Sequence, residues 1–496
     1  MRTRLSLFYG IVCLTTLYGV SGQCAEAQIK RKFNVLFIMA DDLRTDLATY
    51  GAPALTPNLD RLARRSLQFD RAYCQQAVCN PSRSSTLTGR RPDTLNLWSN
   101  GIHFREHNPA VTTLPLWFKE HGYLTRCVGK IFHNWHTKVK GDPQSWSASE
   151  YLHYANHADD LPKVSGELPP NLAKAPRCEC RDVPDEAYYD GRVATEAERV
   201  LAEVKGQPFF LAVGFWKPHA PFNAPKKYWD LYDRAKLPTY DPSRPQGAPE
   251  LAFHDSRELR GIPPKQITFT PEQAAEIRHG YLANISYMDA QLGKVIDALD
   301  QHGLAENTVI VFLGDHGYHL GEHDLWGKTS NFELDARVPL MISSPKLNQR
   351  GRQSNELVEL VDLFPTLVDL CQLPIPKDLD GTSFARMLDD PNAKGKPAAF
   401  TQHPRPAYFD REPTRSPKAM GYSVRTPKVR YTEWRDWKTG QVLQRELYDS
   451  LNDPNETRNA LDAPSLADSQ HAAERLLRTQ FPLHPQGPAS ENSSSQ

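Results

Sequence analysis

Short apolar runs rich in β-branched and aromatic residues recur along the chain, separated by stretches with helical periodicity. Four of them are predicted to be buried strands: Asn34–Met39, Pro208–Phe215, Thr308–Leu313 and Val338–Ser343. Continuous apolar runs are typical of strands buried on both faces, and their alternation with helices is typical of parallel sheets. The pattern predicts an α/β fold in which helices sandwich a large, mainly parallel sheet.

The clearest helical pattern extends from about Pro271 to Gln301, and Gly303 provides a stop signal after it. Its apolar residues recur every three or four positions: Ile277, Tyr281, Ile285, Met288, Leu292, Val295 and Leu299. This spacing predicts one long helix with an apolar face.

The composition changes at about Asp390, where a segment rich in proline and charge begins. Such a segment is typical of a linker or domain edge. Beyond it, Met420–Trp434 and Arg445–Glu456 have the pattern of short strands joined by turns. We therefore predict a large domain over 33–390, a smaller C-terminal α+β subdomain over 391–485 with a short antiparallel sheet, and a disordered tail over 486–496.

The first 27 residues have the pattern of a secretory signal, with two arginines, an apolar run from Leu5 to Val20 and the small residues Ala25 and Ala27. The apolar run is shorter than the roughly 20 residues that span a bilayer, so no stable membrane span is expected. A lipoprotein anchor at Cys24 is the alternative. The signal predicts export to the periplasm, the exterior or another extracytoplasmic compartment.

The overall composition limits the class of partner. Lys plus Arg and Asp plus Glu each number 59 in 496 residues, so no net charge draws the protein to nucleic acid. Six cysteines remain after the signal, which is too sparse for a disulfide scaffold in a chain of this length. An anionic substrate would have to be held by cations that the fold gathers locally.

Polar side chains follow three of the predicted strands directly: Asp41 and Asp42, then Lys217 and His219, then Asp315 and His316. Ligands of open α/β sheets bind at the carboxyl ends of the strands, so these groups are expected to converge. Adjacent carboxylates repel unless a cation lies between them, and oxygen ligands favour a hard cation. We expect a divalent cation, with Ca²⁺ first, Mg²⁺ second and Zn²⁺ less favoured.

Further cations and proton donors stand in short motifs along the chain: Arg83, Lys130 and His133, Lys217 and His219, and Lys328. Any one of them alone is most simply a solvated surface group. Together they fit a clamp for a tetrahedral anion, with histidine as acid and base.

The stretch Val78–Arg90, VCNPSRSSTLTGR, contains Cys79 two residues before a proline. A cysteine alone in this setting is most simply a buried thiol at a helix start. The pattern C-x-P-S-R followed by LTGRRP, however, resembles the signature of the type I sulfatases, in which a formylglycine-generating maturation enzyme oxidises the cysteine to an aldehyde. The resemblance implies that Cys79 becomes formylglycine.

The resemblance extends from about Asn34 to Asn459 and is closest, within that family, to the iduronate-2-sulfatases. It implies an alkaline-phosphatase-like fold with the catalytic domain over 33–390. It also implies that one Ca²⁺ per chain is bound by Asp41, Asp42, formylglycine 79, Asp315 and His316. Arg83, Lys130 and Lys328 would hold the sulfate and the aldehyde hydrate, His133 would assist the hydrate, and His219 would protonate the leaving oxygen.

The implied chemistry explains why an aldehyde is needed. Its hydrate has two hydroxyls on one carbon. One hydroxyl attacks the sulfur of the substrate and expels the sugar alcohol, which leaves a covalent sulfate ester. Loss of the proton of the second hydroxyl then re-forms the carbonyl, and sulfate leaves by cleavage of the C–O bond. The implied substrate is the 2-O-sulfate of iduronate at the end of a heparan- or dermatan-type oligosaccharide. Tyr318 and Leu325 replace a tryptophan and a glutamate of the mammalian enzyme on a loop expected to face the sugar, which leaves another sulfated polysaccharide open.

Two other classes of function remain alternatives. A phosphoester or phosphonate hydrolase of the same superfamily would use similar groups, but commonly with Ser or Thr or with two metals. A sulfated-glycan binding protein without catalysis would not need the complete catalytic set. The expected partners are a sulfated oligosaccharide or polysaccharide and the maturation enzyme.

Overall fold

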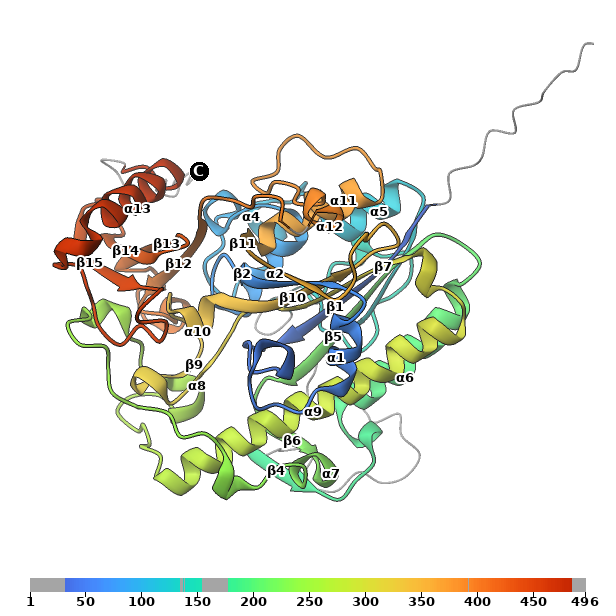
Figure 1. The fold of residues 1–496 in the computed structure, drawn as a ribbon, viewed down its shortest axis with the longest axis horizontal. Helices are drawn as coiled ribbons and strands as arrows, with labels where there is room; N and C mark the ends of the chain where they lie inside the picture. Colours follow the sequence, from blue (N-terminus) through green and yellow to red (C-terminus); the bar gives the residue numbers. More distant parts are fainter. Residues whose placement is uncertain (1–31, 134–136, 138, 154–176, 391, 484–496) are drawn as a thin grey trace, which may run out of the picture. The chain divides into compact units, whose positions relative to one another are not determined.

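The computed structural model describes residues 32–133, 137, 139–153, 177–390 and 392–483 (Figure 1). The predicted signal peptide over 1–27 and the predicted tail over 486–496 lie outside these residues. The domain boundary at 390 and 391 stays a prediction.

A seven-stranded sheet forms the centre of the fold, in the order β11-β2-β10-β7-β1-β5-β3. Its strands are β1 (Asn34–Asp41), β2 (Leu67–Tyr73), β3 (Leu124–Gly129), β5 (Phe209–Pro218), β7 (Thr308–Gly314), β10 (Arg337–Ser343) and β11 (Arg352–Glu359). All neighbouring pairs are parallel except those of β10, which is antiparallel to both β2 and β7. The prediction of a mainly parallel sheet, including the four apolar runs, is confirmed.

Both faces of this sheet are covered by helices (Figure 1). Alternate residues of β1 enter two separate cores: Val35 and Phe37 face one, Leu36 and Ile38 the other. The first core includes α2 (Cys79–Thr88), α5 (Leu114–Glu120) and α11 (Leu363–Leu370); the second includes α1 (Pro57–Ala63), α6 (Tyr189–Val204) and α9 (Pro271–Gln301). This burial on both sides explains the continuous apolar runs.

Helix α9 has the bounds that its periodicity predicts. Thr270 and Gln273 form a capping box at its start, and Pro271 occupies its first position. Shorter helices are α3 (Pro92–Leu95), α4 (Phe104–His107), α7 (Lys226–Trp229), α8 (Arg257–Arg260), α10 (Glu333–Ala336) and α12 (Arg386–Asp389). Two small sheets pair β4 (Cys178–Arg181) with β6 (Phe222–Pro225) and β8 (His319–Leu320) with β9 (Trp326–Gly327).

A four-stranded antiparallel sheet follows in the C-terminal part, as predicted. It consists of β12 (Ala399–Arg405), β13 (Ala419–Arg425), β14 (Val429–Asp436) and β15 (Val442–Asp449). Helix α13 (Ala467–Gln480) covers it, with Ala473 and Leu477 in the same core as Tyr431 and Leu447.

The proline-rich segment after Asp390, predicted to be a linker or domain edge, contains the strand β12. Pro404 is tolerated because β12 is an edge strand. The strand also bonds to loops of the preceding part of the chain: Gln402 N donates to Gln75 O, directly after β2, and Arg405 Nη1 donates to Thr329 O at 3.0 Å. The segment therefore helps to position the loop that carries Lys328.

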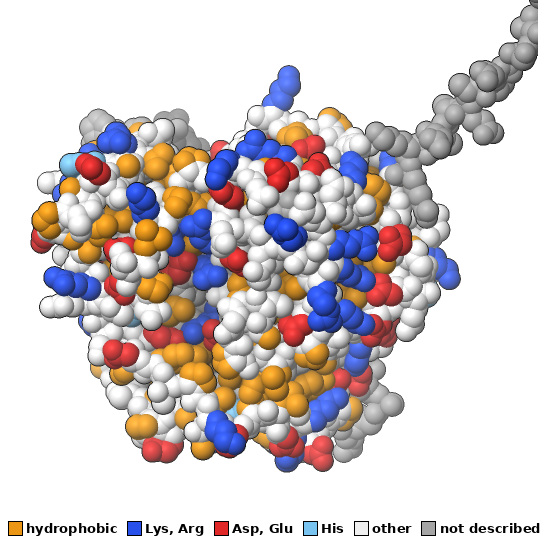
Figure 2. Space-filling view, in the orientation of Figure 1, with side chains coloured by type: hydrophobic (Ala, Val, Ile, Leu, Met, Phe, Trp, Pro, Cys, Tyr) orange, Lys and Arg blue, Asp and Glu red, His pale blue; other side chains and the backbone are white. Residues whose placement is uncertain are grey.

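The surface agrees with the balanced composition. Figure 2 shows acidic and basic side chains interspersed over the face that it draws. All six cysteines in the described part of the chain have free thiols. In that same part, no helix has the length and apolar character needed to cross a membrane.

Candidate active site

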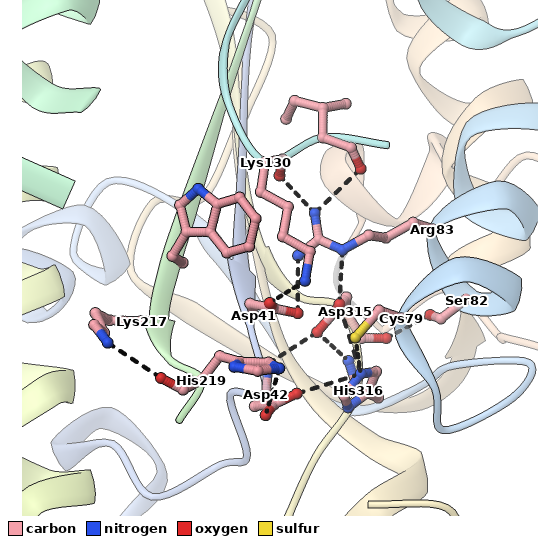
Figure 3. A network of polar contacts seen from close by, with 12 residues as sticks. Asp41, Asp42, Cys79, Ser82, Arg83, Lys130, Lys217, His219, Asp315 and His316 are labelled. Atoms are coloured by element: carbon pink, nitrogen blue, oxygen red, sulfur yellow. Dashed lines mark hydrogen bonds and ion pairs between the residues drawn. The ribbon is translucent and has the colours of Figure 1, made fainter. Parts of the chain in front are cut away.

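Cys79 is the first residue of α2, directly after the extended Val78. All residues of this helix are buried, including its run of small hydroxyl residues. Two of these hydroxyls donate to backbone carbonyls within the helix, Thr86 Oγ1 to Ser82 O at 2.9 Å and Thr88 Oγ1 to Ser84 O at 2.7 Å, while the Ser82 hydroxyl donates to Asp315 O. The Cys79 Sγ atom lies 3.4 Å from His316 Nε2 (Figure 3).

The predicted convergence of strand ends is present. Strands β1 and β7 are parallel neighbours, so Asp41 and Asp42 meet Asp315 and His316 at one edge of the sheet. Asp315 Oδ1 accepts hydrogen bonds from the backbone N–H of Asp42 at 3.0 Å and of His316 at 2.9 Å. Asp42 adopts φ 61°, which turns the chain directly after β1.

Two overlapping groups have ligand atoms that all lie within 4.8 Å of one another. One comprises Asp41, Cys79, Asp315 and His316; the other comprises Asp42, Cys79 and His219. His316 Nδ1 lies 3.0 Å from Gly317 O, so Nδ1 carries the hydrogen of the neutral ring and the lone pair of Nε2 faces Cys79. These donors can hold a divalent cation.

Arg83 is fully buried and contacts two of these carboxylates. Its Nε lies 2.7 Å from Asp315 Oδ2 and its Nη2 3.3 Å from Asp41 Oδ1, while Nη1 donates to Lys130 O and Ile131 O. The guanidinium therefore fixes two carboxylates and the turn after β3 at once.

Two lysines border the carboxylates. Lys130 Nζ pairs with Asp41 and lies 4.8 Å from the centre of the Trp216 ring. Lys328 Nζ lies 2.8 Å from Asp42 Oδ1 and 3.0 Å from Glu258 Oε2. The structure brings Arg83, Lys130 and Lys328 together, as the sequence predicts.

The two predicted histidines also reach the site. His219 Nε2 lies 3.8 Å from Asp42 Oδ2, and its side chain is 28 % exposed. Burial, with a smaller contribution from Lys130, lowers the pKa of the buried His133 well below its usual range. Lys217 does not join the clamp, because its Nζ donates to His219 O, Pro221 O and Asn223 Oδ1. It instead supports the turn that carries His219.

Asp41, Asp42 and His316 have strongly perturbed pKa values. Burial alone would raise the pKa of Asp41, but Lys130 and Arg83 hold it well below its usual range. Burial raises the pKa of Asp42 to about 7, although Lys328 opposes the shift. Burial would lower the pKa of His316, but Asp315 and Cys79 raise it to about 10. The negative field that retains a proton on His316 also favours a metal cation.

Sequence reasoning missed Glu258, which lies on α8 and contacts both Lys328 and Tyr318. The Tyr318 hydroxyl donates to Glu258 Oε1 at 3.3 Å. Leu325, which lies on the loop predicted to be able to face the sugar, is fully buried in an apolar cluster with Phe332 and Trp434. Tyr318 is also fully buried, so it influences the site through its contact with Glu258.

Comparisons with known proteins identify the family of the chain. The sulfatase family model matches residues 33–373, and the model of the N-sulphoglucosamine sulphohydrolase C-terminal domain matches residues 321–481. Iduronate 2-sulfatase of Mus musculus is 36% identical, with 94% of this chain and 96% of the mouse protein covered. The Homo sapiens enzyme is 35% identical, with 91% and 95% covered.

Solved structures support the fold. The phosphonate monoester hydrolase of Agrobacterium radiobacter superposes with a TM-score of 0.70 at 24% identity, with 90% of this chain and 96% of that chain covered. The described elements thus form an alkaline-phosphatase-like fold, as predicted. The chain belongs to the sulfatase family and is a sulfuric ester hydrolase.

Proposed function

We propose that this sulfatase removes the 2-O-sulfate of iduronate, or of a related sulfated sugar, from the end of an oligosaccharide, using formylglycine at position 79 and one Ca²⁺. The observation that carries the proposal is the convergence of Cys79 with Asp41, Asp315 and His316 within 4.8 Å, bordered by three buried cations. The similarity to two mammalian iduronate 2-sulfatases over more than nine-tenths of the chain supports the substrate.

The proposed metal ligands are Asp41, Asp42, residue 79, Asp315 and His316. Three carboxylates and one imidazole with an available Nε2 lone pair suit a hard divalent cation, and oxygen donors favour Ca²⁺ over Zn²⁺. Formylglycine hydrate would supply the nucleophilic hydroxyl, and the cation would supply Lewis-acid stabilisation of charge.

The protein's own cations have the remaining tasks. Arg83 holds Asp41 and Asp315 in place, and Lys130 and Lys328 face the position of the sulfate oxygens. We assign His133 to proton transfer at the hydrate. His219 is the proposed acid: Nδ1 is bonded to Ala220 O, which leaves Nε2 to face the leaving oxygen.

The proposal includes two events outside the active site. The N-terminal signal directs export, and a maturation enzyme converts Cys79 within the motif CNPSR. The substrate panel below also distinguishes iduronate from another sulfated polysaccharide.

Mass spectrometry tests the modification directly. The tryptic peptide covering 72–83 contains both Cys74 and Cys79, so Cys74 is an internal control for thiol alkylation. Protein produced together with the maturation enzyme is expected to show one alkylated thiol and one aldehyde in this peptide. Fully active protein with two alkylated thiols would overturn the proposal.

The substrate is tested with a panel of sulfated sugars: a 2-O-sulfated iduronate disaccharide, 6-O-sulfated glucosamine, and sulfated galactose or fucose oligosaccharides. The iduronate disaccharide is expected to have the highest kcat/KM. If it is not hydrolysed while another sugar is, the iduronate assignment fails and the sulfatase chemistry remains. Replacement of Cys79 by Ala is the inactive control.

A further inference from the structure

Glu258 contributes a carboxylate to the site that is not among the proposed metal ligands. Its two oxygens lie 3.1 and 3.0 Å from Lys328 Nζ, and its Oε1 also accepts the Tyr318 hydroxyl. The Glu258 side chain is 20 % exposed, whereas those of Asp41, Asp42 and Asp315 are fully buried. Glu258 therefore lies at the open side of the carboxylate cluster.

Lys328 does not need Glu258 for neutralisation. Both carboxylate oxygens of Asp42 already accept from Lys328 Nζ, at 2.8 and 3.0 Å. Burying a second carboxylate against one ammonium costs desolvation and like-charge repulsion. Burial would raise the pKa of Glu258, but Lys328 lowers it to about 2, so Glu258 is ionised at neutral pH. The negative charge of Glu258 therefore has a role other than neutralising Lys328.

The charges of the site suggest that role. Asp41, Asp42 and Asp315 balance the cations Arg83, Lys130 and Lys328, so a divalent metal would leave two positive charges. The charge of Glu258 reduces this excess to one. A sulfate monoester carries one negative charge, whereas a phosphate monoester with a second pKa of about 6 carries nearly two at neutral pH.

We propose that Glu258 makes the site selective for singly charged oxyanion esters over doubly charged ones. Its carboxylate faces the ammonium that contacts the oxyanion, and so repels any additional negative charge there. Tyr318 keeps the carboxylate in this position through its hydroxyl. This inference rests on the proposed placement of the oxyanion between the lysines and deepens the proposed function by naming what excludes phosphate monoesters.

The test measures kcat/KM of the wild type and of the variant Glu258→Gln for three aryl substrates. Both proteins are matured and loaded with metal in the same way. Aryl sulfate and aryl phosphonate monoester carry one negative charge, and aryl phosphate carries two at about pH 8. The kcat/KM for phosphate relative to sulfate is expected to rise at least about tenfold, because tenfold corresponds to about 1.4 kcal/mol, which is less than the roughly 4 kcal/mol between unit charges about 4 Å apart near a protein surface. The phosphonate-to-sulfate ratio is expected to stay constant.

Glu412→Gln is the matched control, because Glu412 pairs with Arg257, the residue adjacent to Glu258, and contacts none of the three cations. Its substitution removes the same unit charge and is expected to leave both ratios unchanged. Glu258→Asp keeps the charge and is expected to retain the preference for sulfate even if absolute rates fall. An equal change for all three substrates in Glu258→Gln, or a change in the phosphonate-to-sulfate ratio, would overturn the inference.

A binding measurement separates this inference from the proposed function. Calorimetric titration with inorganic phosphate at about pH 8, where its charge is near two, requires no turnover. Glu258→Gln is expected to bind phosphate several-fold more tightly than the wild type and the Glu412→Gln control. If Glu258→Gln binds phosphate more tightly but the wild type hydrolyses no sulfate ester, the proposed function is refuted and the charge selectivity stands. If the wild type hydrolyses sulfate esters but Glu258→Gln binds phosphate no more tightly, the charge selectivity is refuted and the proposed function stands.

Discussion

Glu446 provides a sharp test of how burial controls the stability of the C-terminal sheet. It lies on β15 and is 2 % exposed. Its oxygens accept from Trp434 Nε1 at 3.0 Å and from the Tyr448 hydroxyl at 2.8 Å, both uncharged donors. Burial raises the pKa of Glu446 to about 7, although these two donors oppose the shift. We predict that Glu446→Gln stabilises the protein above neutral pH.

The sign follows from proton linkage. Glu446 has a pKa near 4.5 when unfolded and about 7 when folded, so between these values the folded state binds the proton more tightly. Stability is therefore lost as the pH rises through this window. At about 1.36 kcal/mol per pKa unit, the loss reaches about 3 kcal/mol above pH 7. Glutamine keeps the shape of the protonated acid and abolishes this loss.

The assay is denaturant unfolding of metal-loaded protein at several pH values from about 4.5 to 8.5. The difference in unfolding free energy between Glu446→Gln and the wild type is expected to be small at the acidic end and to grow to about 3 kcal/mol at the basic end. Glu433→Gln on the neighbouring strand β14 is the control, and its expected change in the free energy of unfolding has the opposite sign. Burial would raise the pKa of Glu433, but Arg478 and Arg435 hold it below its usual range, so this variant is expected to be destabilised at neutral pH. A Glu446→Gln difference that does not depend on pH would refute the reasoning.

Three further predictions concern the site and its support. Chelation of divalent cations is expected to lower the thermal midpoint by mass action, and Asp315→Asn to remove most of that response; an equal response in the variant would contradict the ligand set. Lys217→Met is expected to lower kcat/KM by about 10²-fold through displacement of His219, with little change in the thermal midpoint; unchanged kinetics would exclude the supporting role. Gly421→Ala places a Cβ 2.6 Å from the Trp434 ring and is expected to lower the unfolding free energy by about 1–3 kcal/mol in denaturant titration; an unchanged value would show that the sheet adjusts.

The strands that sequence reasoning found are those buried on both faces. Strands β1, β5, β7 and β10 are almost wholly buried, and a continuous apolar run is the consequence. Strand β11 is an edge strand whose first half is exposed, so its sequence RQSNELVE has no apolar run. Strand β12 was missed because proline and charge are ordinary linker signals, whereas an edge strand accepts both.

The candidate site was predictable where its residues stand in short motifs at strand ends. Asp41, Asp42, Asp315 and His316 were found because β1 and β7 end at the same edge of the sheet. Glu258 stands in a polar segment without a motif and reaches Lys328 only through the tertiary fold. The burial of Leu325 likewise depends on contact with the distant C-terminal sheet, which periodicity does not reveal.

The complete burial of α2 has a consequence for how active protein is made. An enzyme that oxidises Cys79 must bind CNPSR as an accessible segment, but in the folded chain every residue from Cys79 to Thr88 is inaccessible. If formylglycine forms at position 79 as proposed, oxidation and folding are competing rates, and a chain that folds first traps an unreactive thiol that the oxidising enzyme cannot reach. The specific activity of a preparation is then fixed during synthesis, and it should rise when folding is slowed or when the oxidising enzyme is more abundant.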